Sequence, residues 1–282
     1  MIKMQNVRKV YPGFDFELSM EIPEGRITGL IGKNGAGKST AIRLMLGLAK
    51  ADGGIIELFG KPITEIMAED RQNIGVSLAE SGFNGQFTIV EVEKILAKMY
   101  PKFEESWFTR ECQKLHLPEG KQFKEFSNGM KAKLRVLTAL SHKAQLLILD
   151  EPTAGLDVEA RNEILDLLRE YAAEDESRTI LITSHIASDL EHLCDDIYLI
   201  HGKQLLHEET DVILEQYGLI KADEAQYAAL DKEYLLDTQK EPYGYACLTN
   251  DRKYYEENVP DLVVERAGID DVILMMTGGE KR

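Results

Sequence analysis

Three groups of residues in this 282-residue chain could do chemistry. The first matches G-x-x-x-x-G-K-[ST] and consists of Gly32, Lys33, Asn34, Gly35, Ala36, Gly37, Lys38, Ser39 and Thr40. Its glycines let backbone N–H groups surround a polyphosphate without side-chain clashes. Lys38 can reach the β- and γ-phosphates, and the Ser39 hydroxyl can ligate Mg²⁺. The stretch therefore predicts that the chain binds ATP or a similar nucleotide with Mg²⁺.

The second group is an acidic pair, Asp150 and Glu151, directly after the apolar run 146–149. Asp150 is predicted to hold Mg²⁺ through water. Alternation along a strand turns Glu151 the other way, where it can act as the base for the attacking water. An isolated acidic pair is commonly a solvated loop start, but together with the phosphate loop it predicts catalysis.

The third group is His185, just beyond the predicted strand 179–183. Ligand sites of open α/β sheets gather at the C-terminal ends of the strands. A histidine in such a loop is more often a surface residue, but the order phosphate loop, acidic pair, strand and histidine favours a γ-phosphate contact. We therefore predict Lys38, Glu151 and His185 as the catalytic residues.

The apolar pattern predicts the elements that position these groups. We expect strands over 2–10, 14–22, 26–31 and 55–59, and a helix through 42–49 that stops at Gly53 and Gly54. The region from about 88 to 142 reads as mostly helical. From 146 onward strand and helix alternate. Strands are expected over 146–149, 179–183 and 197–200, with a helix over 158–171 and another from 186 between them. This alternation predicts an α/β fold with a parallel sheet.

The pattern changes after about residue 215. A helix over 223–236, strands over 243–248 and 261–266 and a short helix over 269–276 are expected there. We predict two units: a nucleotide-binding domain over 1–215, with a helical subdomain at about 88–142, and a small C-terminal α+β domain over 216–282.

Composition restricts the partners and the location. With 33 basic and 49 acidic residues the formal net charge is -16, which disfavours nucleic acid as a partner. No apolar run approaches the roughly 18 residues needed to cross a bilayer, so any spanning segment is expected from another protein. The three cysteines, Cys112, Cys194 and Cys247, are widely spaced and are expected to be reduced thiols in a cytoplasm.

The order of the motifs resembles that of an ABC transporter ATPase subunit. Five segments carry the resemblance, which covers roughly residues 1 to 215: Gly32 to Thr40, Ser127 to Lys131, Leu146 to Glu151, Gly155 to Asp157, and Ser184-His185. It implies a P-loop NTPase fold with an N-terminal antiparallel β-subdomain, a parallel core sheet and a helical subdomain that carries the signature residues Ser127 to Lys131.

The resemblance also implies roles. Tyr11 matches the aromatic residue that stacks on adenine, and Ser127 and Gly129 match residues that contact the γ-phosphate bound by an opposite subunit. A serine-capped helix start is physically suited to such an anion. Asp157 matches the acidic residue that links the two sites. The implied partners are a second ATPase subunit, identical or different, and an integral-membrane permease, with this chain on the cytoplasmic face of the cell membrane.

Two positions depart from the family pattern. The signature usually reads Ser-Gly-Gly-Gln and here reads Ser-Asn-Gly-Met, a form that resembles ATPases serving exporter-type (ABC-2) permeases. The glutamine that usually follows the strand at 74–76 falls on Ala79, which cannot ligate Mg²⁺. Its neighbour Glu80 is a candidate replacement ligand.

Two other functions remain open from the sequence. One is a soluble ABC ATPase that acts on ribosomes or DNA, although such relatives usually carry two cassettes or long coiled-coil insertions. The other is a regulatory nucleotide-binding module without turnover, which the intact Lys38, Asp150, Glu151 and His185 disfavour. The transported substrate, its direction and the role of the residues beyond 215 are not specified by the sequence.

Overall fold

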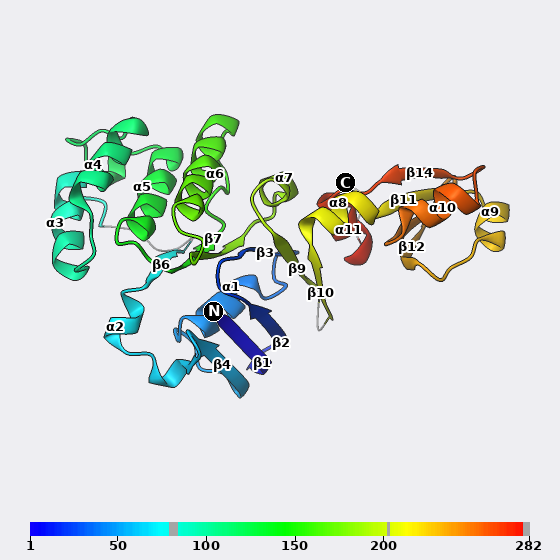
Figure 1. The fold of residues 1–282 in the computed structure, drawn as a ribbon, viewed down its shortest axis with the longest axis horizontal. Coiled ribbons are helices and arrows are strands. Elements are labelled where there is room, and N and C mark those ends of the chain that lie inside the picture. Colours follow the sequence, from blue (N-terminus) through cyan, green and yellow to red (C-terminus); the bar gives the residue numbers. More distant parts are fainter. Residues whose placement is uncertain (79–83, 202–203, 279–282) are drawn as a thin grey trace.

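The computed structural model describes residues 1–78, 84–201 and 204–278. Its centre is a six-stranded sheet in the order β10-β9-β3-β8-β7-β6 (Figure 1). The strands are β3 (Ile27–Gly32), β6 (Ile74–Ser77), β7 (Leu146–Asp150), β8 (Thr179–Thr183), β9 (Asp196–His201) and β10 (Gln204–Glu209). Neighbouring strands from β6 to β9 run parallel, and β10 pairs with β9 antiparallel. The predicted parallel core sheet is confirmed, with β10 as an additional edge strand.

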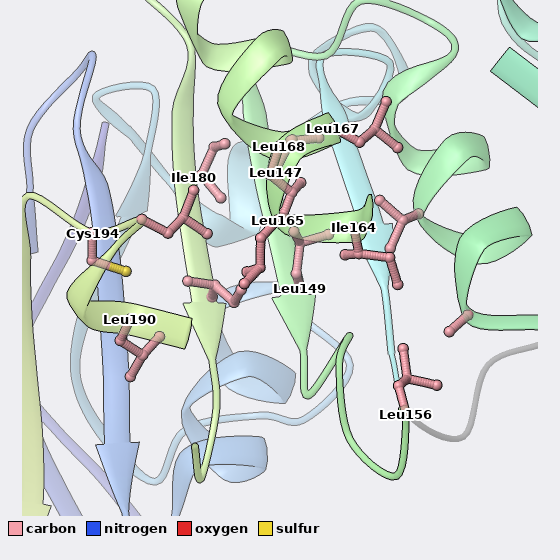
Figure 2. Packing of buried hydrophobic residues seen from close by; sticks show 14 of the residues in the cluster. Leu147, Leu149, Leu156, Ile164, Leu165, Leu167, Leu168, Ile180, Leu190 and Cys194 are labelled. Atoms are coloured by element: carbon pink, nitrogen blue, oxygen red, sulfur yellow. The ribbon is translucent and has the colours of Figure 1, made fainter. Parts of the chain in front are cut away.

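Strand β7 shows why the sheet holds together. All five of its residues are buried, and they alternate between two cores. Leu146 and Ile148 pack with the side of the sheet that holds helix α1 (Lys38–Met45). Leu147 and Leu149 pack on the other side against helix α6 (Val158–Ala173), as Figure 2 shows. A parallel strand covered on both faces is expected to be apolar, and β7 obeys this up to its last residue, Asp150.

The N-terminal part forms a second, antiparallel sheet in the order β2-β1-β4-β5. Its strands are β1 (Ile2–Tyr11), β2 (Phe14–Ile22), β4 (Gly53–Leu58) and β5 (Lys61–Pro62). The helix expected through residue 49 ends earlier, at Met45, because Gly47 adopts a φ of +67° just beyond its last turn. Gly53 and Gly54, expected to stop that helix, begin β4 instead.

The segment between β6 and β7 is helical, as predicted. It holds α3 (Ile89–Met99), α4 (Glu105–Lys114) and α5 (Asn128–Leu140), which lie together at one end of the molecule in Figure 1. Thr88 caps α3 by accepting a hydrogen bond from the Glu91 N–H. The remaining helices before residue 200 are α2 (Ala68–Arg71), α7 (Ala187–Glu191) and two short 3₁₀ turns at Ile63–Glu65 and Phe123–Glu125.

The C-terminal part forms a third sheet in the order β12-β13-β11-β14, at the opposite end of the molecule from α3 and α4 (Figure 1). Its elements are α8 (Thr210–Gln216), β11 (Gly218–Ala222), α9 (Glu224–Ala229), β12 (Leu235–Glu241), β13 (Gly244–Thr249), α10 (Arg252–Asn258), β14 (Val263–Arg266) and α11 (Ile269–Met276). The predicted α+β character is confirmed. The boundary at residue 215 stays a prediction.

One element of this part was predicted wrongly. The single helix expected over 223–236 ends at Ala229, and after a turn the chain forms β12 from Leu235. Pairing with β13 from Leu235 to Glu241, and packing of Leu235 against the small core that holds Cys247 and Tyr255, override the local helical pattern. The two short strands β10 and β11 and helices α8 and α10 were not predicted.

Across the three described ranges, no helix combines the length and the apolar character needed to span a bilayer. All three cysteines are buried and free, and burial raises the pKa of the Cys112 thiol to about 12. They therefore act as small apolar core residues.

The two-sided burial of β7 generates a stability prediction. Ile148→Ala, at a position with no exposed surface, should lower the free energy of unfolding by about 2–5 kcal/mol, because it leaves a cavity in a packed core. Ile55→Ala, whose side chain is 53% exposed on β4, should cost less than about 1 kcal/mol. Urea denaturation followed by circular dichroism measures both, and equal costs would contradict the described packing.

Candidate nucleotide-binding site

The predicted phosphate loop connects β3 to α1. Gly32 ends the strand with a φ of +154°, and a Cβ atom there would lie 2.6 Å from the Ile200 carbonyl oxygen. Gly37 precedes the helix with a φ of +112°, and its added Cβ would lie 2.7 Å from the Phe16 ring. Both positions therefore require glycine, and the loop is held in a shape that a side chain would disrupt.

Lys38 is fixed inside this loop. Its ammonium donates a hydrogen bond to the Gly32 carbonyl at 2.7 Å, and its side chain is only 8% exposed. The same Nζ lies 3.8 Å from Glu151 Oε1. The loop cation and the acid after β7 thus come together at the C-terminal edge of the sheet, as the sequence predicted.

Asp150 ends β7 and is bound from two sides. Ser39 Oγ donates to its Oδ2 at 3.2 Å, and Thr183 Oγ1 donates to its Oδ1 at 2.8 Å. A hydroxyl and a carboxylate next to the phosphate loop are the oxygen ligands that Mg²⁺ takes alongside phosphate oxygens. The described part of the chain has no group of three or more His, Cys, Asp or Glu side chains that could hold a metal ion. The hydroxyl of Ser39 and the carboxylate of Asp150 fit Mg²⁺ that takes its other ligands from a nucleotide.

Glu151 leaves the strand in a strained conformation. Its φ is +50°, a left-handed value that non-glycine residues rarely adopt, and its N–H donates to Thr183 Oγ1 at 2.9 Å. Its Oε2 accepts from the His185 ring Nδ1 at 2.6 Å. The turn sends the two neighbouring acids to different partners, with Asp150 on Ser39 and Glu151 on Lys38 and His185.

Two adjoining cavities open at this edge. One, of about 530 Å³, is lined by Phe14, the phosphate loop and Glu151. The other, of about 570 Å³, lies between Gly32, Glu151, His185 and Ile273. Tyr11 does not line either cavity, but its ring stacks on Phe14 at 6.5 Å between centroids. Phe14 is thus the aromatic residue that lines the cavity beside the phosphate loop, and the sequence reasoning missed it.

The signature residues form a different cavity, of about 370 Å³. Ser127 caps α5 by accepting from the Met130 N–H at 3.2 Å, and Asp157 caps α6 by accepting from the Ala160 N–H at 2.8 Å. Gly129 and Asp157 line this cavity together with Ser127. None of its described lining residues belongs to the two cavities at the phosphate loop. Within one chain, therefore, the structure does not bring Ser127 and Gly129 to Lys38.

Two sequence expectations cannot be placed. Ala79 and Glu80 lie outside the described residues, so the proposed replacement of the usual glutamine by Glu80 stays a prediction.

Thr183 is a second residue that the sequence reasoning missed. Its hydroxyl joins Asp150 to the backbone of Glu151. The available signal was the parallel pairing of β7 with β8, which sets Asp150 directly opposite Thr183. The sequence shows that the strand paired with the one ending in Asp150 itself ends in threonine, and this would have indicated Thr183 as a partner of Asp150.

The chain can be compared with known proteins on this basis. The protein-family model described as "ABC transporter" matches residues 16–154, and a second one, "AAA domain, putative AbiEii toxin, Type IV TA system", matches residues 121–188. The chain is 32% identical over 220 residues to "ABC transporter ATP-binding protein YtrB" of Bacillus subtilis (strain 168), covering 77% of this chain and 75% of that protein. The chain belongs to the ABC transporter family. The predicted resemblance is confirmed, and the chain is an ATP-binding subunit and an ATPase of this family.

Other members of the ABC transporter family agree with this assignment. "Bacitracin transport ATP-binding protein BcrA" of Enterococcus faecalis is 35% identical over 212 residues, which cover 74% of this chain and 68% of that protein. A solved structure titled "Structure of ATP binding subunit of ABC transporter" superimposes with a TM-score of 0.66 at 25% identity. It covers 75% of this chain and 91% of that one. The P-loop ABC ATPase fold is thus confirmed.

The position of Thr183 generates a prediction about activity. Thr183→Val keeps the shape of the side chain but leaves the buried Asp150 oxygen and the Glu151 N–H without their partner. Since an unsatisfied buried polar group costs roughly 1–3 kcal/mol, we expect ATPase activity to fall by about tenfold or more. The measurement is steady-state phosphate release with Mg-ATP.

Thr28→Val is a matched control for this variant. Thr28 lies in the adjacent strand β3, is fully buried, and its hydroxyl has no hydrogen-bond partner among the described residues. Its replacement should leave activity nearly unchanged. Equal activity in the two variants would show that the Thr183 hydroxyl plays no part in the site.

Proposed function

We propose that this chain hydrolyses Mg-ATP to power an exporter-type membrane permease. The observation that carries the proposal is the meeting of Lys38, Asp150 and Glu151 at one edge of the parallel sheet. The loop cation lies 3.8 Å from the Glu151 carboxylate, and the loop hydroxyl Ser39 lies 3.2 Å from the Asp150 carboxylate. A phosphate-binding loop with two acids in different orientations is suited to phosphoryl transfer to water.

In the proposed mechanism each residue has one task. Lys38 neutralises the β- and γ-phosphates, while Ser39 and Asp150 hold Mg²⁺, which when bound polarises the phosphate oxygens. Glu151 accepts the proton of the attacking water. His185, whose Nδ1 contacts Glu151 at 2.6 Å, orients that carboxylate and contacts the γ-phosphate.

The residues that contact the adenine and the phosphates of ATP are assigned from their places in or next to the cavity. Tyr11 stacks on the adenine, with Phe14 beneath it beside the loop. The backbone from Gly32 to Thr40 surrounds the phosphates, as the positive φ values of its glycines allow.

The chain is proposed to work as a head-to-tail pair with a second cassette. Ser127 and Gly129 line a cavity of their own and cannot complete the site of their own chain. A capped helix start of this kind offers N–H groups to an anion. The γ-phosphate of the opposite subunit is the anion proposed, with Asp157 near the junction between the two sites.

The membrane partner is proposed from the relatives. Besides the bacitracin transport protein, they include "Lantibiotic transport ATP-binding protein SrtF" of Streptococcus pyogenes, 34% identical over 216 residues, which cover 75% of this chain and 92% of that protein. A permease of this exporter type would supply the membrane-spanning segments. This chain would then act on the cytoplasmic face, with residues 1–215 as the ATPase domain and 216–282 as an accessory domain.

The first test of this function concerns the general base. Glu151→Gln should reduce ATPase activity at least about a hundredfold, because an amide cannot accept the proton, while ATP binding persists. Phosphate release and equilibrium dialysis with labelled ATP measure the two quantities. Glu24→Gln, at an exposed position after β2, is the control and should be fully active. Undiminished turnover in Glu151→Gln would remove Glu151 from the mechanism.

The second test concerns assembly. Glu151→Gln with Mg-ATP should form a dimer, because hydrolysis no longer releases the bridging nucleotide. Adding Gly129→Asp should block that dimer by placing a carboxylate against the partner's γ-phosphate. Sedimentation velocity with and without Mg-ATP distinguishes these states.

Gly129→Ala is the control for the added Cβ, which lies 3.3 Å from the Ala160 Cβ. This variant should still dimerise, since it adds no charge. A Gly129→Asp variant that dimerises would contradict the proposed sandwich. A Glu151→Gln variant that stays monomeric at saturating ATP would exclude the homodimer and leave only a different cassette as partner.

A further inference from the structure

The last of the described helices, α11 (Ile269–Met276), leads directly into a contact with the phosphate loop. The Lys33 ammonium donates a hydrogen bond to the Thr277 carbonyl oxygen at 2.7 Å. Thr277 directly follows α11 and is only 4% exposed. Figure 1 shows α11 on the side of the third sheet that faces the rest of the chain. A residue of the ATP-binding loop is thus bonded to a point 244 residues further along the chain.

The other end of α11 is bonded to the segment that follows His185. The Ile269 N–H, at the first residue of α11, donates to Glu191 Oε1 at 2.9 Å. Glu191 is the last residue of α7, a helix that begins two residues after His185. One helix therefore connects the phosphate loop with the helix that follows the predicted γ-phosphate histidine.

The charged groups at the two ends of α11 match the polarity of the helix. The first N–H groups of a helix need acceptors and its last carbonyls need donors, and the helix dipole favours an anion at the start and a cation at the end. Glu191 and Lys33 supply these two charges in the correct order. An eight-residue helix with both ends bonded in this way cannot shift without breaking one of the bonds.

Packing holds α11 in place between these ends. Ile269, Val272 and Met275 are buried in the same core as Leu190 of α7 and Leu149 of β7. Ile273 is half-buried and lines the cavity that Glu151 and His185 also line. The helix therefore forms part of the wall of the site itself.

We infer that α11 is a positioning element of the ATP site, which sets the phosphate loop relative to His185 through Lys33 at one end and Glu191 at the other. This inference rests on the proposed ATPase function and deepens it. It gives the C-terminal segment a role in nucleotide binding. Because binding energies are reciprocal, ATP bound at the loop should also stabilise α11.

A double-mutant cycle tests whether the two ends act through one helix. Lys33→Met and Glu191→Ala should each raise KM for ATP about fivefold and change kcat less than about twofold, since the groups that act on the γ-phosphate remain. The double variant should also raise KM for ATP about fivefold. Once one end of α11 is released, the bond at the other end no longer fixes the phosphate loop, so losing it adds little. If Lys33 acted only through its charge on ATP, the effects would multiply to about 25-fold.

Conservative variants and a control accompany the cycle. Lys33→Arg keeps a donor and Glu191→Gln keeps an acceptor, so each should have a KM for ATP close to that of the unchanged protein. Lys240→Met removes an exposed ammonium that pairs with Glu224 in the third sheet, and should have no effect on KM. Multiplicative effects, or a failure of both conservative variants to restore KM, would overturn the inference.

Hydrogen exchange provides a readout that does not need hydrolysis. In a Glu151→Gln background, ATP should slow amide exchange across 269–277, and Lys33→Met should abolish this protection while ATP at saturating concentration still binds. ATP binding without any protection of α11 would overturn the inference and leave the proposed function standing. Absence of ATP binding at any concentration would overturn the proposed function and the inference with it.

Discussion

Asp150 is a carboxylate buried at the end of strand β7, whose other four residues are all apolar, and only 8% of its surface is exposed. A buried charge of this kind must be surrounded by hydrogen-bond donors or a cation. The donors come from two distant parts of the chain, Ser39 at the start of α1 and Thr183 at the end of β8. The same Thr183 oxygen accepts the Glu151 N–H, so one carboxylate fixes the phosphate loop, the neighbouring strand and the turn that follows.

That turn explains how adjacent acids obtain different tasks. Glu151 has a φ of +50°, and a non-glycine residue held in such a region costs on the order of 1–3 kcal/mol. Its bond to Thr183 and its contacts with Lys38 and His185 offset this cost. In a regular strand, Asp150 and Glu151 would point to opposite faces of the sheet, as the sequence suggested. The strained turn instead brings the Glu151 carboxylate back to within 3.8 Å of the Lys38 ammonium.

The C-terminal segment shares the hydrophobic core of the ATPase sheet. Tyr217, Leu248 and Met275 belong to the same buried cluster as Leu147 and Leu149. A second, smaller core around Ile220 and Tyr255 lies within the third sheet itself. The C-terminal segment is therefore packed against the central sheet through a shared core. This packing can hold the Lys33 ammonium at 2.7 Å from the Thr277 carbonyl oxygen.

The sequence by itself determined the nucleotide chemistry, the parallel sheet and the family. These depend on local signals: the glycine spacing of the phosphate loop, the apolar run before Asp150, and the order of the motifs along the chain. Tertiary structure alone decided that Thr183 joins the two acids, that Phe14 borders the loop and that α11 reaches Lys33. It also decided that the helix expected over 223–236 ends at Ala229 and that strand β12 begins at Leu235. The reason in each case is that the deciding partner is remote in sequence, so that no local pattern encodes which strand edge or helix end it will meet.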